Sequence, residues 1–325
     1  MCANRSRRWS RRGVLTASTA LLAGCTSEEP ATADDPQLSA GTETTSEGPT
    51  ATDRQPASQE TATSAGDDPT DVVFRETSDG ALKLDLYLPD DGNRSPFVVF
   101  AHGGAWVLGE KGHRPMFDRL TASGYAVADI QYRLAQQERY PGPVRDVVAA
   151  VKWVRDNARE YDIDASRGAL AGYSAGAHLA MLVGLAPDHE RFQPPEYKPG
   201  VPAAVDAVVG YSGPYDFTTP GSDSNSAVRA FFGSDAGEAT LAEGSPVTHV
   251  DPDDPPVMLV HGTDDSIVPY RSTTVLADAL RGADVPVEVI TGDGAGHGMI
   301  DNQEWREQTL PSQIEFLDTH LDGTR

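Results

Sequence analysis

The sequence predicts an α/β fold, in which helices cover both faces of a mostly parallel sheet. Residues 97–101, Phe-Val-Val-Phe-Ala, form a short apolar run, as expected of a strand covered on both faces. Valines recur at helical spacing between residues 144 and 154. Strand-like and helix-like segments alternate in this way from about residue 71 onward, and such alternation favours a parallel sheet between two layers of helices.

The individual elements follow from the same criteria. Alternating apolar and polar residues over 83–88 predict a half-exposed antiparallel strand near one edge of the sheet. Residues 97–101 and 125–130 predict central strands, and the valine pattern predicts a helix that ends near residue 161. The later elements are strands over residues 168–173, 205–211, 257–261 and 285–291, and helices over residues 174–185, 271–281 and 304–321.

Residues 1–25 predict an export signal. The pair Arg11-Arg12 precedes an apolar run that is too short to span a bilayer, and this pattern resembles a twin-arginine signal. The four residues that end at Cys25, Leu-Ala-Gly-Cys, resemble a lipobox. We therefore expect Cys25 to be lipidated and to become the mature N-terminus. The lipid would then be the protein's only membrane attachment, on the extracellular face of the cell membrane.

A linker and one folded domain are expected after this leader. Residues 26–70 are almost all small or polar and cannot bury an apolar core, which predicts a disordered acidic linker rich in Thr, Ser and Pro. Residues 71–325 are expected to form the folded domain. Both cysteines, Cys2 and Cys25, lie in the leader, so this domain contains no disulfide and no cysteine-bound metal.

The chain is strongly acidic, with a formal net charge of -23. Such a charge repels nucleic acid and acidic lipid, and we expect neither as a partner. The acidic residues are spread along the chain, and only four lysines occur. This distribution favours a solvated acidic coat, and we expect a halophilic source.

Gly172-Tyr173-Ser174-Ala175-Gly176 lies between a predicted strand and a predicted helix. Gly-x-Ser-x-Gly in this context predicts a strained turn that exposes the serine hydroxyl above the sheet. Ser174 is therefore the candidate nucleophile. The Ala175 amide would lie at a helix N-terminus, where it can donate to a developing oxyanion.

A second glycine-rich segment, His102-Gly103-Gly104-Ala105-Trp106, follows the strand over residues 97–101. Glycines after such a strand let backbone amides point into a site, and we expect those of Gly103 and Gly104 to complete an oxyanion hole. His102 is expected to brace this loop by hydrogen bonding. Trp106 is expected to pack in the core or to form a pocket wall.

The candidate base and its carboxylate come later in the chain. His297 lies after the last predicted strand in Gly-Ala-Gly-His-Gly, where small neighbours leave the imidazole free to reach Ser174. In enzymes with a Gly-x-Ser-x-Gly turn the catalytic residues follow in the order Ser, Asp, His, so the carboxylate is expected on the loop after a late strand. Asp264 and Asp265 both lie there. The residues alone leave the choice between them open.

Together these segments resemble the α/β-hydrolase superfamily, and within it the carboxylesterase and arylformamidase-like group with an HGGxW loop. The similarity extends from about residue 72 to about residue 321 and includes Tyr-Arg-Leu at residues 132–134. The family pattern His-Gly-x-x-Asp-x-x-Val-Pro selects Asp265 as the carboxylate. The resemblance implies a mostly parallel sheet of eight strands, no metal and no organic cofactor. Gln131 replaces an acidic residue that is usual in this group, which puts a local salt bridge in doubt.

The expected function is hydrolysis of short or medium acyl esters through an acyl-enzyme, with a small-molecule ester as the partner. The same residues would also serve an arylformamidase or a peptidase. A non-catalytic surface lipoprotein on a hydrolase fold is the alternative of another class. The Gly- and Pro-rich insertions over residues 187–202 and 213–252 form either a small cap over the site or ordinary connecting loops.

Overall fold

The computed structural model describes residues 6–10, 68–195 and 197–321. Nine strands form one sheet in the order β1-β9-β8-β7-β6-β4-β5-β3-β2. The strands are β1 (Ser6–Ser10), β2 (Val72–Thr77), β3 (Gly80–Tyr87), β4 (Ser95–Ala101), β5 (Ala126–Ile130), β6 (Ile163–Tyr173), β7 (Ala207–Tyr211), β8 (Val257–Gly262) and β9 (Val287–Asp293). The helices are α1 (Pro115–Thr121), α2 (Gly142–Asn157), α3 (Ala175–Leu185), α4 (Ser226–Phe232), α5 (Glu238–Glu243), α6 (Arg271–Gly282) and α7 (Gln303–Leu321).

The sheet is parallel except at one edge, as the sequence predicts. β3 is antiparallel to both β2 and β5, and the remaining neighbours run parallel. The period-two pattern over residues 83–88 is therefore confirmed as an antiparallel strand close to the edge. The eight strands from β2 to β9 match the expected number. β1 pairs in parallel with β9 and adds a ninth strand, which the sequence did not predict.

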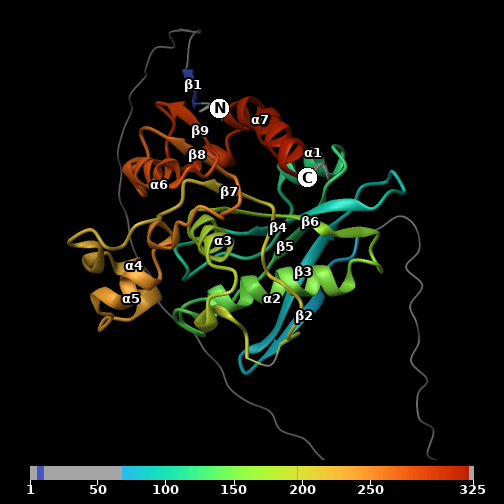
Figure 1. Cartoon of the computed structure of the whole chain (residues 1–325), viewed down its shortest axis with the longest axis horizontal. Helices are drawn as coiled ribbons and strands as arrows, with labels where there is room; N and C mark the ends of the chain where they lie inside the picture. The colour runs from blue at the N-terminus through green and yellow to red at the C-terminus, as the bar shows by residue number, and fades with distance from the viewer. Residues whose placement is uncertain (1–5, 11–67, 196, 322–325) are drawn as a thin grey trace, which may run out of the picture. The chain divides into compact units, whose positions relative to one another are not determined.

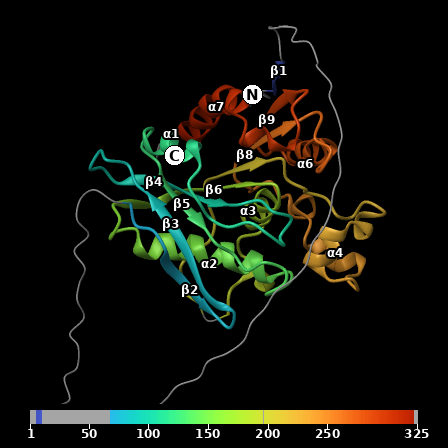
Figure 2. The ribbon, with the colours of Figure 1, turned by 180° about the vertical axis from the view of Figure 1, so that it is seen from behind.

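Two helical layers cover the sheet, and alternate side chains of β4 pack against one layer or the other. Phe97 and Val99 contribute to the core under α2, α3 and α6, whereas Val98 and Phe100 contribute to the core under α1 and α7. All four side chains are fully buried. Figures 1 and 2 show α1 and α7 close together, away from α2 and α3. The continuous apolar run is thus explained by burial on both faces.

Several predicted elements differ in length, and some were not predicted. The helix expected to end near residue 161 ends at Asn157. β2 was missed because Val-Val-Phe-Arg-Glu-Thr does not alternate cleanly, and its pairing with β3 shifts register between Val73 and Arg75. Helices α1, α4 and α5 were also missed; α1 and α4 have seven residues each and α5 has six.

The leader and linker predictions concern residues that are almost all outside the described part of the chain. Cys25, the arginine pair and residues 26–67 lie outside it. Residues 6–10 of the expected leader form β1. In the part that the structure describes, no helix combines the length and apolar composition needed to cross a bilayer.

Candidate active site

Ser174 occupies a strained turn between β6 and α3. Its backbone has φ 54° and ψ −117°, a combination that L-residues rarely adopt. A Cβ on Gly172 would lie 2.3 Å from the Gly176 carbonyl oxygen, and one on Gly176 would lie 2.1 Å from the Ala101 carbonyl oxygen. Only glycine fits at both positions. The two glycines therefore let strand, turn and helix approach closely enough to place Ser174 at the carboxyl edge of the sheet.

The three residues expected to act together meet at this edge. His297 Nε2 lies 3.0 Å from Ser174 Oγ, and His297 Nδ1 lies 2.8 Å from Asp265 Oδ2. Ser174 follows β6, Asp265 follows β8 and His297 follows β9. In the sheet β8 and β9 are adjacent, and β7 lies between β6 and β8. The structure thus joins hydroxyl, imidazole and carboxylate in one chain of hydrogen bonds, although they are separated by up to 123 positions in sequence.

Asp265 is the carboxylate in this chain, and Asp264 is not. The Asp265 side chain is fully buried, while Asp264 is exposed and its carboxylate accepts a hydrogen bond from the neighbouring Thr263 hydroxyl. Asp265 Oδ1 accepts hydrogen bonds from the amides of Ile267 and Val268, each at 2.9 Å. Burial by itself raises the pKa of Asp265, but hydrogen bonds led by those from His261 and His297 outweigh it and hold the pKa well below its usual range.

The loop with Gly103 and Gly104 packs against the serine turn at Gly103. A Cβ on Gly103 would approach the Tyr173 ring to 2.8 Å, so the loop packs directly against the residue before Ser174. Among the described residues, neither the Gly103 nor the Gly104 amide donates to another residue. Ala175 is the first residue of α3, where an amide has no partner within the helix. These three backbone amides remain the candidates for an oxyanion hole at Ser174.

Two buried histidines brace the glycine loop. His102 Nδ1 donates to the Gly103 carbonyl oxygen at 2.7 Å, and its ring stacks on Tyr132. Trp106 Nε1 donates to His178 Nδ1 at 3.2 Å. His178 lies four residues after the nucleophile on α3, and its Nε2 donates to the Gly244 carbonyl oxygen at 2.8 Å. The expected bracing role of His102 is confirmed, and His178 adds a second brace.

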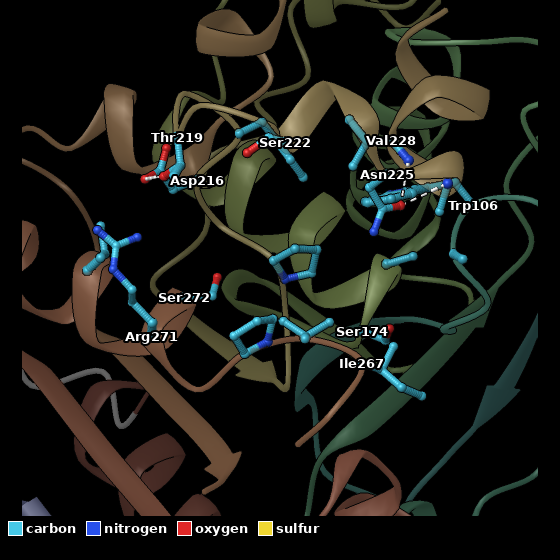
Figure 3. A pocket seen from close by; sticks show the side chains of 18 residues that line it. Trp106, Ser174, Asp216, Thr219, Ser222, Asn225, Val228, Ile267, Arg271 and Ser272 are labelled. Atoms are coloured by element: carbon cyan, nitrogen blue, oxygen red, sulfur yellow. Dashed lines mark hydrogen bonds between the residues drawn. The ribbon is translucent and has the colours of Figure 1, made fainter. Parts of the chain in front are cut away.

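A pocket of about 300 Å³ opens onto Ser174. Apolar walls come from Trp106, Phe217, Val228 and Ile267, and Figure 3 shows Ile267 beside Ser174. Polar residues, among them Asp216 and Arg271, lie away from Ser174 in the same view. Eight residues of one insertion, between Pro214 and Val228, line this pocket, and none of its lining comes from the described residues of the other insertion, 187–195 and 197–202. One insertion therefore forms part of the site, whereas the other connects elements elsewhere.

The sequence missed two contacts of the site. His261 Nε2 lies 3.0 Å from Asp265 Oδ2, and the Tyr173 hydroxyl donates to the His297 carbonyl oxygen at 3.1 Å. His261 belongs to the His-Gly-x-x-Asp pattern, which could have drawn attention to it. In residues 6–10, 68–195 and 197–321, no group of three His, Cys, Asp or Glu side chains is arranged to hold a metal ion.

A parallel sheet between helical layers, with a serine on a strained strand-to-helix turn, defines an α/β-hydrolase. Residues 84–280 match the model of the BD-FAE family, and the chain belongs to that family. The resemblance to the superfamily that the motifs indicated is therefore confirmed.

Named relatives agree with this assignment. The chain is 32% identical over 236 residues to Esterase LipC of Mycobacterium tuberculosis, covering 68% of this chain and 57% of LipC. It is 30% identical over 213 residues to Esterase LipQ of the same organism, covering 62% of this chain and 50% of LipQ. The chain spans about half the length of the curated relatives it matches.

Solved structures show the same fold. A truncated form of a carbohydrate esterase from gut microbiota superposes with a TM-score of 0.70 at 25% identity, covering 78% of this chain and 97% of that one. The propionate-bound esterase of Thermogutta terrifontis superposes with a TM-score of 0.67 at 27% identity, covering 76% and 92%.

Proposed function

We propose that this protein is a serine carboxylesterase. The observation that carries the proposal is the continuous hydrogen-bonded chain from Ser174 through His297 to Asp265, at the mouth of a pocket. Relatives named as esterases support it. Ser174 is the nucleophile, His297 the general base, and Asp265 the carboxylate that orients the base.

Acylation begins when His297 Nε2 takes the hydroxyl proton of Ser174 as Oγ attacks the ester carbonyl. The carbonyl oxygen becomes an oxyanion, and the amides of Gly103, Gly104 and Ala175 stabilise it. His297 then gives its proton to the leaving alcohol, the ester C–O bond breaks, and the acyl group remains on Ser174.

Deacylation repeats these steps with water. His297 removes a proton from the water that attacks the acyl-enzyme, and it returns this proton to Ser174 Oγ as the carboxylic acid leaves. In both half-reactions the imidazole becomes positively charged. The buried Asp265 carboxylate lies 2.8 Å from Nδ1, where it stabilises that charge and fixes the tautomer that leaves Nε2 free to accept.

The pocket supports short or medium acyl groups as the substrates. Its volume of about 300 Å³ is at the small end of the range of ligand sites. Aromatic side chains limit it, since Trp106 stacks on Phe231 and contacts Phe217 edge-on. The Thermogutta terrifontis esterase, which shares the fold, has been solved with propionate and with butyrate bound.

We also propose that the protein is exported and attached to the extracellular face of the membrane through a lipid on Cys25. The twin-arginine pattern and the lipobox support this location, and the acidic composition supports a salt-rich medium outside the cell. Cys25→Ser should release the protein from the membrane fraction into the medium. Retention of the variant in the membrane fraction would contradict the anchor.

The activity is tested with the full chain on p-nitrophenyl acetate, butyrate, decanoate and palmitate, at low and high salt. We expect hydrolysis that is fastest on the acetate and butyrate and falls at least about 10⁴-fold in Ser174→Ala. Ser123→Ala, at an exposed serine near the end of α1, is the matched control and should match the wild type.

Aryl formamides and peptide anilides are measured in parallel. Faster turnover of either would place the same triad in an arylformamidase or a peptidase. Equal rates for Ser174→Ala and the wild type on every substrate would contradict the serine mechanism altogether.

A further inference from the structure

His261 contacts the same carboxylate oxygen as the catalytic imidazole. His261 Nε2 lies 3.0 Å from Asp265 Oδ2, the atom that His297 Nδ1 reaches at 2.8 Å. His261 is at the end of β8, and its side chain is fully buried. Two imidazoles therefore contact the same oxygen of Asp265.

The surroundings of His261 fix which nitrogen carries its proton. Nε2 faces two acceptors at 3.0 Å, Asp265 Oδ2 and the Val268 carbonyl oxygen, so Nε2 must be protonated to donate to them. Nδ1 faces the Thr273 hydroxyl of α6 at 2.7 Å, and this hydroxyl can donate to it. Both ring nitrogens thus have hydrogen-bond partners, and the ring presents an N–H group to Asp265.

These contacts leave the Asp265 carboxylate no freedom to turn. Its Oδ1 is held by the amides of Ile267 and Val268, and its Oδ2 by the two imidazoles. Rotation of the carboxylate, whose side chain is fully buried, would break hydrogen bonds at both oxygens. The hydrogen bond from His261 also withdraws negative charge from Oδ2, the oxygen that faces His297.

We propose that His261 is a positioning residue for the reaction, which directs Oδ2 of Asp265 toward His297 and sets how strongly that oxygen stabilises the protonated base. The inference rests on the proposed triad. Loss of the His261 donor leaves Oδ2 more negative and less well oriented. The first effect makes His297 harder to deprotonate, and the second slows proton transfer in the transition state.

A purely structural role is the competing explanation, since His261 also ties β8 to α6 through Thr273. Asparagine and glutamine separate the two roles. His261→Asn keeps an amide near the position of Nδ1 and its contact with Thr273, but it cannot reach Asp265. His261→Gln extends an amide to the position of Nε2 and retains a donor to Asp265. Two tyrosines also face these imidazoles: the ring centroid of Tyr270 lies 5.7 Å from that of His261, and the ring centroid of Tyr173 lies 5.1 Å from that of His297.

The experiment uses the full chain with ¹³C-labelled histidine. The His297 signal, assigned by its loss in His297→Gln, is titrated in wild type, His261→Asn and His261→Gln. Turnover of p-nitrophenyl butyrate and thermal unfolding are measured on the same samples. His113→Asn is the control, because His113 forms an exposed pair with Asp118 at 2.7 Å outside the pocket.

We expect His261→Asn to raise the midpoint of the His297 titration by about half to one pH unit and to lower kcat by about 10- to 100-fold, with KM within threefold. His261→Gln and His113→Asn should stay close to the wild type in both measurements. An unmoved midpoint in His261→Asn, or equal losses in the Asn and Gln variants, would overturn the inference. A shifted His297 midpoint in a protein that turns over no ester would support the positioning role of His261 and contradict the proposed esterase activity instead.

Discussion

Replacing Asp265 with Asn tests how the buried carboxylate controls His297. Two donors contact each carboxylate oxygen, but the backbone amides at Oδ1, from Ile267 and Val268, can only donate, whereas the two imidazoles at Oδ2 can change tautomer. The amide oxygen therefore takes the Oδ1 position, and its NH₂ group takes the Oδ2 position. There it faces His297 Nδ1 as a donor, where the carboxylate was an acceptor.

His297 must then change tautomer, with its proton on Nε2 and a lone pair on Nδ1. An Nε2–H group cannot accept the proton of Ser174, 3.0 Å away, so the general base is lost. We expect kcat/KM to fall by about 10⁴-fold, which corresponds to about 5 kcal/mol of transition-state stabilisation. The assay is p-nitrophenyl butyrate hydrolysis, with circular dichroism to confirm that the variant is folded.

Asp264→Asn is the matched control, because Asp264 is the adjacent residue and its side chain is exposed. It should change kcat/KM by less than about twofold, as for a surface substitution. A loss smaller than tenfold in a folded Asp265→Asn protein would refute the assignment of Asp265. Equal losses in the two variants would refute it as well.

Two further predictions concern the glycine loop and a buried acid. A Cβ on Gly104, at φ +123°, would lie 1.9 Å from the Leu108 carbonyl oxygen, so the loop must shift to accept alanine. Because this shift displaces a proposed oxyanion donor, Gly104→Ala should lower kcat by about 100- to 1000-fold. Gly112→Ala, where a Cβ meets nothing within 4 Å, should be nearly silent, and similar rates in both variants would count against the oxyanion hole. Burial raises the pKa of Asp129 to about 7. The folded protein therefore favours the protonated carboxyl, and this stabilisation is complete below about pH 4 and is lost as the pH rises through 7. In urea unfolding, Asp129→Asn should gain on the order of 3 kcal/mol relative to wild type at pH 8 and little at pH 4; equal effects at both pH values would contradict this.

The central strands and the hydrogen-bonded arrangement of Ser174, His297 and Asp265 could be predicted because their sequence signals are local. β4 and residues 168–172 of β6 are buried on both faces, which produces short runs without charged residues, whereas the first half of β6, residues 163–167, is partly exposed and was not predicted. The turn at Ser174 needs glycines two residues before and after it, which produces a short motif. Loops after parallel strands meet at one edge of the sheet, so motifs far apart in the sequence could be placed together.

The pocket wall and the second partner of Asp265 depend on packing that no short pattern encodes. Phe217 and Val228 line the pocket because a Gly- and Pro-rich insertion folds back over Ser174, and its composition is equally typical of a plain loop. His261 lies in a familiar motif, but its contact with Asp265 requires the turn that follows β8. The choice of Asp265 over Asp264 likewise came from the family resemblance. The structure gives the physical reason, because the Asp265 side chain is buried and contacts His297.

The central claim, that Ser174 is a nucleophile activated by His297, is tested most directly by covalent labelling. Paraoxon is a suitable probe, because an activated serine hydroxyl attacks its phosphorus and releases p-nitrophenolate. The full chain is incubated with paraoxon, and the diethylphosphoryl group that displaces p-nitrophenolate is located by peptide mass spectrometry. We expect one adduct, on Ser174, which forms at least about 10³-fold more slowly in His297→Ala. An unlabelled Ser174, or labelling that is as fast without His297, would contradict the account.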